Sequence, residues 1–418
     1  MSDYYAYLDS QVNDLLNIDI GFNNLLGSSL YCLDSHILNC FFDRYYLIKK
    51  FQNITLSLFN ASLLNEFDPE VASLVINELP DHMAYNYHRR LAESNIQTHK
   101  TPFYFRTDQV ADGKIIEIQC PGSAWGLYEQ LHHFFTDHGS SFGKITNFSR
   151  RLSENFASSL TKRLGKEAAI HHLLDNASIP YCVRFFIQKT RRQHVRYFGY
   201  DRDVTPYNCN FIRGHAFAGL WSDNFASRRI SAWTRGLLEY DLPPSILFDE
   251  KISIVFPFWE KTMKYFGDDI REMFPYTQLI TPEGFYLEDG SRMTISQFCR
   301  LSQKQRNYFV KYAGSDLDLN WGSKGVHFLG MYSRVKCEEL FRALLEGYNL
   351  RKYWIIQKAH PITDKMGYFT RDKKLVEANL HTKFSGFYGP DGLMGILVML
   401  RPFSKVHGSI NTVLTVCK

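Results

Sequence analysis

The chain lacks the cysteine patterns of zinc-binding and disulfide-rich proteins. Its eight cysteines are scattered, form no CxxC pair and show no zinc-binding spacing with histidine. The first residues also lack the basic and then apolar pattern of a secretion signal. Scattered cysteines without such a signal are typical of reduced thiols, and we therefore expect a cytoplasmic protein.

Two further absences disfavour whole classes of function. The longest apolar stretches are far shorter than the ~20 residues that span a bilayer, so no association with a membrane is expected. There is no GxSxG motif, and no cysteine stands in a catalytic signature. A hydrolase that uses a covalent nucleophile is therefore disfavoured.

What is present is the composition of an ordinary globular protein. Of the 418 residues, 45% are hydrophobic and 22% are charged, and this length allows two or three domains with a sizeable core. The 48 basic and 43 acidic residues give a net charge of +5, which permits an anionic ligand such as a nucleotide. Nucleic acid is not expected as a partner, because the densest basic run, residues 189–194, is more typical of a solvated loop.

The periodicity of the apolar residues predicts an α+β protein with three regions. Residues 1–100 are mainly helical, and Asp68 is expected to cap a helix that ends at Pro80. Residues 101–270 are expected to hold a hairpin at 103–120, a helical pattern at 150–174 and a strand at 179–187. Residues 271–418 are expected to hold strands at 308–312 and 353–358, a helix at 337–347 and paired strands between 395 and 416.

The hairpin at residues 105–120 has an unusual charge pattern. Its Asp112-Gly113 dipeptide suits a two-residue type I′ turn, and the pairing that follows from this turn puts Asp108 directly opposite Glu117. Strand alternation places Arg106 and Gln119 on the same face as these two acids. Like charges directly opposite each other destabilise a strand pair, so this face requires an explanation.

A divalent cation between the two carboxylates would make the arrangement favourable. Carboxylate and amide oxygens are the hard ligands that Mg²⁺ takes, and phosphates commonly complete its shell. Arg106 could then hold a phosphate oxygen or a substrate carboxylate. The alternative is a solvated outer face of the hairpin, on which opposed acids are screened and tolerated.

Two later segments could bind a nucleotide. A strand ending in Lys311 leads into a loop of small and polar residues at 313–326, whose glycines would let backbone N–H groups approach an anion. This loop matches neither GxxxxGK[ST] nor GxGxxG, and a flexible surface loop is the alternative. The apolar strand at 354–358 ends in polar residues and could offer backbone groups to an adenine, although it could also be a plain buried strand.

Six segments follow one another along the chain from residue 100 to residue 418. They are FRTD…GKIIEIQCPG, LPPSILFDEKISIVF, MFPYTQLI, NYFVKYAGSDLDLNWGSKGVHFLG, YWIIQK and GILVMLRPFSKVHGSINTVLTVC. In this order they resemble the glutathionylspermidine-synthetase-like, circularly permuted ATP-grasp ligases. The segments resemble, in turn, that family's Arg-x-Asp…Glu-x-Asn metal hairpin, its Pro-Pro…Lys segment, its entry into the next subdomain, its ATP lysine strand with the phosphate loop, its adenine strand and its closing strands.

The resemblance implies an ATP-grasp fold with ATP and Mg²⁺ as cofactors. Residues 101–270 would carry the metal-binding hairpin and a central α/β substrate lobe, and residues 271–418 the nucleotide-binding subdomain and closing strands. The metal would be held by Asp108, Glu117 and Gln119, with Arg106 at the γ-phosphate or acyl phosphate and Arg401 lining the site. The residues implied to bind ATP are Lys251, Lys311, Gly322, Ser323, Lys324, Gly325, Gln357 and Lys358.

The activity that the resemblance implies is carboxylate–amine ligation. ATP would phosphorylate the carboxylate of a small molecule or peptide, and an amine would attack the resulting acyl phosphate to form an amide. The chain departs from the family pattern in two places: Gln119 stands where the family usually has Asn, and the phosphate loop carries Asp316 and Asp318. These departures keep open a second hypothesis, a catalytically weak or inactive module that binds a nucleotide or a protein.

Overall fold

The structure is a computed structural model. It describes residues 25–76, 86, 88–89, 92–93, 101–110, 112–120, 124–137, 144–148, 150–164, 168–172, 181–192, 195–198, 211–213, 231, 235–240, 246–248, 250–314, 319, 324–360, 362–370, 372, 374–406 and 411–418. At residues 171–172, 181–185, 196–198, 212–213, 240 and 246 it describes the backbone without the side chain. None of the described helices combines the length and the apolar composition that a membrane-spanning segment requires.

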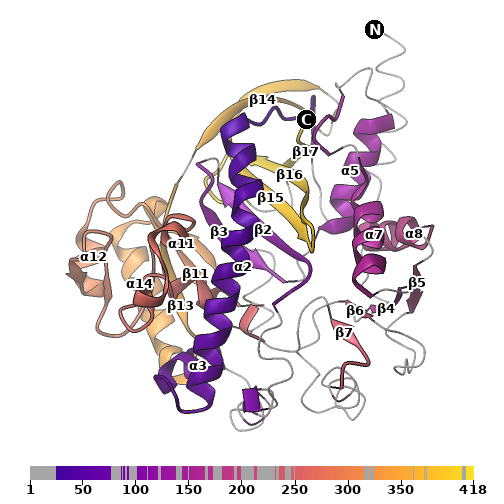
Figure 1. Ribbon diagram of the computed structural model, residues 1–418. Coiled ribbons are helices and arrows are strands. Elements are labelled where there is room, and N and C mark those ends of the chain that lie inside the picture. Colours follow the sequence, from indigo (N-terminus) through magenta and orange to yellow (C-terminus); the bar gives the residue numbers. More distant parts are fainter. Residues whose placement is uncertain are drawn as a thin grey trace.

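The largest sheet is mixed and joins strands that lie far apart in the sequence. In spatial order its seven strands are β14 (Thr363–Phe369), β1 (Leu25–Gly27), β17 (Val413–Val416), β16 (Gly392–Arg401), β15 (Leu375–Gly389), β2 (Phe105–Val110) and β3 (Ile115–Gln119). Only β1 and β17 are parallel within it, and β14 also pairs with β15, so that five strands close into a ring. The β2–β3 hairpin extends from this ring, and the sheet therefore combines strands from all three predicted regions (Figure 1).

A second, antiparallel sheet lies beside the hairpin. Its order is β12 (Val326–Phe328), β11 (Tyr308–Tyr312), β13 (Trp354–Lys358) and β8 (Thr277–Leu279). Helices α12 (Ile295–Arg300) and α14 (Arg334–Glu346) bury one face, where Val310 and Ile356 share a core with Phe341. Because side chains alternate along a strand, Lys311 and Gln357 point to the opposite face.

The third sheet is small and parallel. It contains β5 (Arg196–Phe198), β4 (Ala169–His172), β6 (Phe211–Arg213) and β7 (Glu239–Tyr240). Helices α7 (Leu152–Leu164) and α8 (Tyr181–Arg191) lie near it at the side of the molecule away from α12 and α14 (Figure 1). The remaining short elements are β9 (Phe285–Tyr286), β10 (Arg292–Met293), α11 (Asp268–Glu272) and the 3₁₀ turns η1 (Ile246–Phe248), η2 (Lys251–Val255), η3 (Met263–Tyr265), η4 (Leu329–Met331) and η5 (Tyr348–Leu350).

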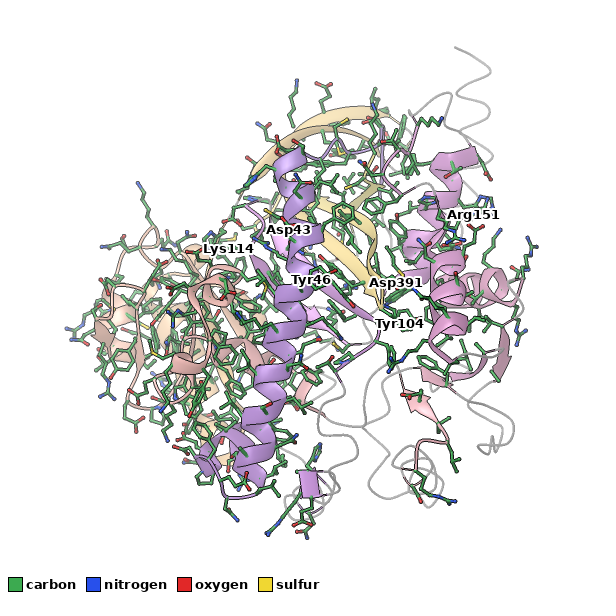
Figure 2. The ribbon with its side chains drawn as sticks, in the orientation of Figure 1. Asp43, Tyr46, Tyr104, Lys114, Arg151 and Asp391 are labelled. Atoms are coloured by element: carbon green, nitrogen blue, oxygen red, sulfur yellow. The ribbon has the colours of Figure 1, made fainter. Side chains whose placement is uncertain are left out.

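Two helices cover opposite faces of the large sheet. The long α2 (Ser35–Leu63) packs on one face, where the Tyr388 hydroxyl donates to the Phe41 carbonyl at 2.9 Å. Its outer side carries the exposed Asp43 and Tyr46 (Figure 2). On the other face Trp125, at the start of α5 (Trp125–Asp137), contacts Phe387 with ring centroids 5.2 Å apart.

Several predicted elements are confirmed. Strands β11 and β13 and helix α14 occur at the expected places, and the final strands β16 and β17 pair as expected. Asp68 caps helix α3 (Pro69–Val75) by accepting a hydrogen bond from the Glu70 N–H. That helix ends earlier than predicted, and Pro80 lies outside the described residues.

Three local predictions are wrong. The strand predicted at 179–187 is helix α8 from Tyr181 onward, because its apolar positions 183, 186 and 187 also fit helical spacing and a short run does not discriminate. The helical pattern predicted through residue 174 ends at Leu164, and β4 follows, stabilised by parallel partners that local periodicity does not show. The hairpin turn is not the two-residue type: the Val110 N–H bonds to the Lys114 carbonyl at 3.0 Å, which leaves three positions between them.

Candidate functional site

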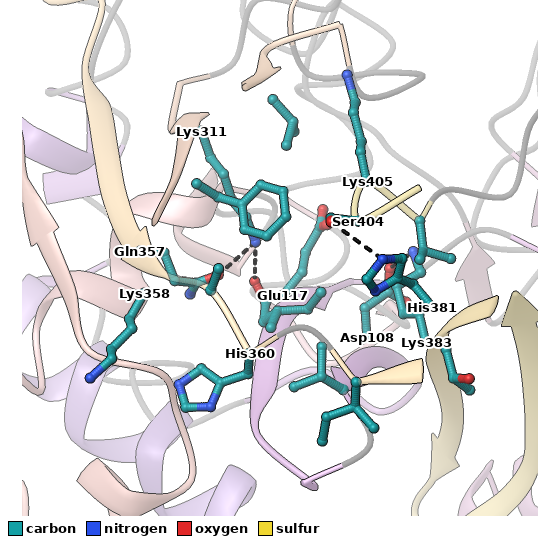
Figure 3. Close-up of a pocket in the computed structure, with 18 residues that line it drawn as sticks. Asp108, Glu117, Lys311, Gln357, Lys358, His360, His381, Lys383, Ser404 and Lys405 are labelled. Carbon is teal, nitrogen blue, oxygen red and sulfur yellow. Dashed lines mark hydrogen bonds and ion pairs between the residues drawn. The ribbon is translucent and has the colours of Figure 1, made fainter. Parts of the chain in front are cut away.

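A pocket lies between the β2–β3 hairpin and the face of the antiparallel sheet that carries Lys311 and Gln357. It is lined from β2 and β3 by Asp108 and Glu117, and from β11 and β13 by Lys311 and Gln357. Strand β15 adds His381 and Lys383, and the segment after β16 adds Ser404 and Lys405. Figure 3 shows Lys311 and Gln357 on one side of Glu117, and Asp108, Lys383 and His381 on the other. The pocket thus collects charged groups from distant parts of the chain.

The hairpin places its polar residues as the sequence predicted. Asp108 pairs directly with Glu117, and Arg106 pairs with Gln119. The Arg106 guanidinium contacts both oxygens of Asp108, at 3.1 and 3.3 Å. The Gln119 amide donates to Glu117 Oε1 at 3.1 Å. All four side chains therefore share one face.

The predicted pairing survives the different turn because β3 contains a bulge. Gly113 adopts a positive φ of 78°, and Gln109 pairs with Ile115, one position away from the predicted register. Ile116 is the extra residue, and beyond it the register returns to Asp108 opposite Glu117. Since one residue of slip would turn Glu117 to the other face, the bulge preserves the acidic pair.

Asp108 is surrounded by donors. Only 1% of its surface is exposed, Lys383 Nζ lies 2.6 Å from Oδ2, and the Ser385 hydroxyl donates to Oδ1 at 2.7 Å. Burial raises the pKa of this carboxyl, but the charges of Arg106 and Lys383 outweigh burial and hold the pKa well below its usual range. Asp108 is therefore an ionised, fully paired carboxylate.

Glu117 has its own cation. Lys251, the first residue of η2, places Nζ 3.1 Å from Glu117 Oε1. Burial raises the pKa of Glu117, while Lys251 lowers it and Asp108 raises it again; the net shift is downward. The two opposed acids thus remain charged because lysines from η2 and β15 stand beside them.

The side chain of Lys311 on β11 reaches to the β2–β3 hairpin. Its Nζ donates to the bulged Ile116 carbonyl at 3.0 Å and to Gln357 Oε1 at 2.6 Å. The Gln357 amide nitrogen donates in turn to the Thr277 hydroxyl at 3.0 Å, which orients the amide. Burial lowers the pKa of Lys311 to about 8, so this ammonium group titrates close to neutral pH.

The other predicted site residues have contacts outside the group formed by Asp108, Glu117 and Lys311. Lys358 lines the pocket and pairs with Glu288 at the surface, and Arg401 donates to the Lys405 carbonyl at 3.3 Å. Lys324 is exposed, and the Gly325 N–H bonds to the Leu319 carbonyl at 2.9 Å. Gly322 and Ser323 lie outside the described residues.

The backbone at the end of β13 is already hydrogen-bonded. β13 is flanked by β11 and β8, so both of its edges are paired. The Lys358 N–H donates to the Tyr276 carbonyl and the Ala359 N–H to the Asn307 carbonyl, at 2.9 and 3.0 Å. An adenine bound here would have to contact the segment after Ala359, where His360 Nδ1 lies 2.6 Å from Asp112 Oδ2.

Sequence reasoning missed the contribution of β15. Lys383, Ser385 and His381 were not predicted, nor were Ser404 and Lys405 in the following segment. His381 Nε2 lies 3.4 Å from the Ser404 hydroxyl, and burial lowers the pKa of this histidine. Alternation of polar side chains at 381, 383 and 385 was the available signal, but nothing local showed that this strand pairs with β2.

The donor set is compatible with a divalent cation. Asp108, Glu117 and Gln119 bring carboxylate and amide oxygens to one face, as hard cations require. Among the described residues, however, no group of three His, Cys, Asp or Glu side chains is placed to hold a metal. Oxygens from a ligand such as a phosphate would therefore have to complete the shell.

Among comparisons with known proteins, a likeness to a solved structure bears on the fold. No family model matches the chain, and no curated protein matches it. A solved structure of a glutathione synthetase-like effector from Globodera pallida aligns over 94% of this chain and 90% of its own, with 12% identity and a TM-score of 0.51. A candidate gamma-glutamylcysteine synthetase from Methylobacillus flagellatus KT covers 84% of this chain and 83% of its own, with 12% identity and a TM-score of 0.41. The chain has an α+β fold with a large mixed sheet, consistent with an ATP-grasp-like fold.

Proposed function

We propose that this protein is an ATP- and Mg²⁺-dependent carboxylate–amine ligase that forms an amide or peptide bond through an acyl phosphate. The observation that carries this proposal is that Asp108, Glu117 and Lys311 line one pocket, while Lys251 pairs with Glu117 at 3.1 Å. These residues come from three separate segments, and the resemblance implies metal and phosphate roles for all four.

The fold supports the proposal at the level of overall architecture. An overall likeness to a glutathione synthetase-like effector fits the resemblance to glutathionylspermidine-synthetase-like, circularly permuted ATP-grasp ligases. We propose a small-molecule or peptide carboxylate and an amine as the co-substrates. The membership of that family, the circular permutation and a cytoplasmic location are parts of the proposal.

The side chains of the pocket suit phosphoryl transfer, in which charge neutralisation and positioning provide most of the catalysis. Lys311 and Lys251 would neutralise phosphate oxygens from two sides, and Arg106 would bind the γ-phosphate or the acyl phosphate. Asp108, Glu117 and Gln119 would hold Mg²⁺, which when bound neutralises charge on the phosphates. No nucleophilic side chain is required.

ATP consumption in the presence of pooled carboxylic acids and amines tests the proposal. ADP and phosphate should be released by the wild-type protein and not by Asp108→Ala or Glu117→Ala. Lys365→Ala is the matched control, because Lys365 lies on β14 in an exposed pair with Glu377. Unchanged turnover in both acidic variants would contradict the proposed function.

A second candidate is a nucleotide-binding or protein-binding module with weak or no catalysis. The observation that favours it is that both carboxylates already form ion pairs with cationic side chains of the chain itself. A thermal-shift measurement with ATP and Mg²⁺ separates the two candidates when it is combined with product analysis. Stabilisation by ATP without release of ADP, with all co-substrates present, would favour the binding module.

A further inference from the structure

Lys383 is bonded to the carboxylate that a metal would need. Its Nζ lies 2.6 Å from Asp108 Oδ2, while the Ser385 hydroxyl donates to Oδ1. Both side chains of the ion pair are almost completely buried, with 9% of Lys383 and 1% of Asp108 exposed. A cation that ligated Asp108 would therefore have to displace Lys383 or compete with it.

Cationic side chains outnumber the two carboxylates of Asp108 and Glu117. Four cationic side chains, those of Arg106, Lys251, Lys311 and Lys383, surround the two carboxylates within the described part of the chain. Burial raises the pKa of Glu117, and Lys251, Lys311 and Lys383 all lower it, so Lys383 acts on both acids. The two carboxylates are therefore already surrounded by an excess of positive charge.

This excess of positive charge favours the binding of a polyphosphate before that of a divalent cation. A divalent cation alone would add positive charge where cations predominate. It would also leave the buried ammonium group of Lys383 without its counterion. A polyphosphate would instead attract the ammonium groups, and Lys383 could exchange Asp108 for a phosphate oxygen. The exchange would release Oδ2 for a metal, so each ligand would improve the binding of the other.

We infer that Lys383 is an internal counterion that excludes divalent cations from Asp108 until a polyphosphate binds. Lys383 is thus a positioning residue for the metal. The inference rests on the proposed function, since it takes a nucleoside triphosphate as the ligand that draws Lys383 away.

The first experiment measures the binding of Mn²⁺ to the nucleotide-free protein by electron paramagnetic resonance. We expect weak binding by the wild-type protein and at least about tenfold tighter binding by Lys383→Met, within the usual range of coupling between sites. Lys383→Arg keeps the charge and should bind Mn²⁺ as weakly as the wild type. Lys365→Met removes an exposed lysine from β14 and should have no effect.

The second experiment measures binding of the β,γ-imido analogue of ATP in EDTA by calorimetry. The wild-type protein should bind the metal-free analogue, and Lys383→Met should bind it about tenfold more weakly because one phosphate partner is lost. The wild-type measurements in both experiments require no variant, so a folding defect of Lys383→Met would not block the test.

The outcomes separate the inference from the proposed function. Tight Mn²⁺ binding by the nucleotide-free wild type, or equal Mn²⁺ binding by a folded Lys383→Met, would overturn the inference even if the ATP analogue binds. Failure of the wild type to bind the analogue would count against the proposed function. A gain of Mn²⁺ binding in Lys383→Met would still support the exclusion of cations by Lys383.

Discussion

The Nζ atom of Lys311 lies 3.0 Å from the carbonyl oxygen of Ile116, the residue that bulges from β3. A bulged residue is left out of the strand ladder, so its carbonyl is accessible to a partner from elsewhere. The irregularity that keeps Asp108 opposite Glu117 therefore also ties the hairpin to β11. One extra residue in β3 serves both the geometry of the acids and the position of the lysine.

The affinity for a nucleotide should depend on pH through Lys311. In the free protein its pKa is lowered to about 8, so the ammonium form that attracts phosphate is lost as the pH rises above this value. Between pH 8 and the higher pKa of the complex, affinity should fall by up to about tenfold per pH unit. Calorimetric titration with the ATP analogue from pH 7 to 9.5 measures this. Lys311→Arg should show a much flatter profile, and an equally steep profile would contradict the assignment.

Removing the charge of Asp108 should destabilise the fold. Asp108→Asn preserves the size of the side chain but leaves Arg106 and Lys383 buried without their counterion, which typically costs about 3–5 kcal/mol in the free energy of unfolding. The double variant Asp108→Asn/Lys383→Met should recover part of the loss. Urea unfolding measures both, and Asp391→Asn, in an exposed pair with Lys162, is the control with an expected effect below about 1 kcal/mol. Additive effects of the two buried substitutions would show that the pair is not coupled.

Acid should weaken the fold through the same two carboxylates. The pKa values of Asp108 and Glu117 are lowered in the folded protein, so their contribution to stability is present above the unfolded pKa values of about 4. The contribution is lost as the pH falls below these values and the folded carboxylates become protonated. Unfolding free energies measured from pH 7 to pH 3 should therefore decrease less in Asp108→Asn than in the wild type. Parallel curves for the two proteins would argue against an ionised, paired Asp108.

Gly113 should tolerate substitution less well than Gly290, another glycine with a positive φ. Gly113 and Gly290 have φ values of 78° and 81°, so alanine at either site costs roughly 1 kcal/mol in the left-handed region. A Cβ at Gly113 would also lie 3.0 Å from the Arg44 guanidinium, whereas at Gly290 it would meet nothing within 4 Å. Arg44 donates to Gln109 at 3.1 Å, so its displacement would disturb β2. Thermal unfolding of Gly113→Ala and Gly290→Ala measures the difference, and equal shifts would show that Arg44 moves without cost.

Sequence reasoning was most reliable where a structure depends on a short segment. The predicted pairing of Asp108 with Glu117 was confirmed, although it depends on a bulge that offsets the longer turn. The strand pattern placed Lys311 near the end of β11. It was least reliable for short apolar runs such as 179–187, in which strand and helix patterns overlap and the surrounding packing decides. The turn at Gly113 was also misassigned, because Asp-Gly occurs in more than one kind of hairpin turn.

The sequence alone determined that Arg106 and Asp108 share one face of β2 and that Glu117 and Gln119 share one face of β3, because the side-chain period of a strand is a local property. The bulge at Ile116, which alternation does not show, brings both pairs to the same face of the hairpin. Only the tertiary structure decided how these charges are neutralised. Lys383 is 275 positions from Asp108, and it reaches the carboxylate because β15 pairs with β2. Pairing between distant strands is set by burial and hydrogen bonding of the whole sheet, which no segment of the sequence contains alone.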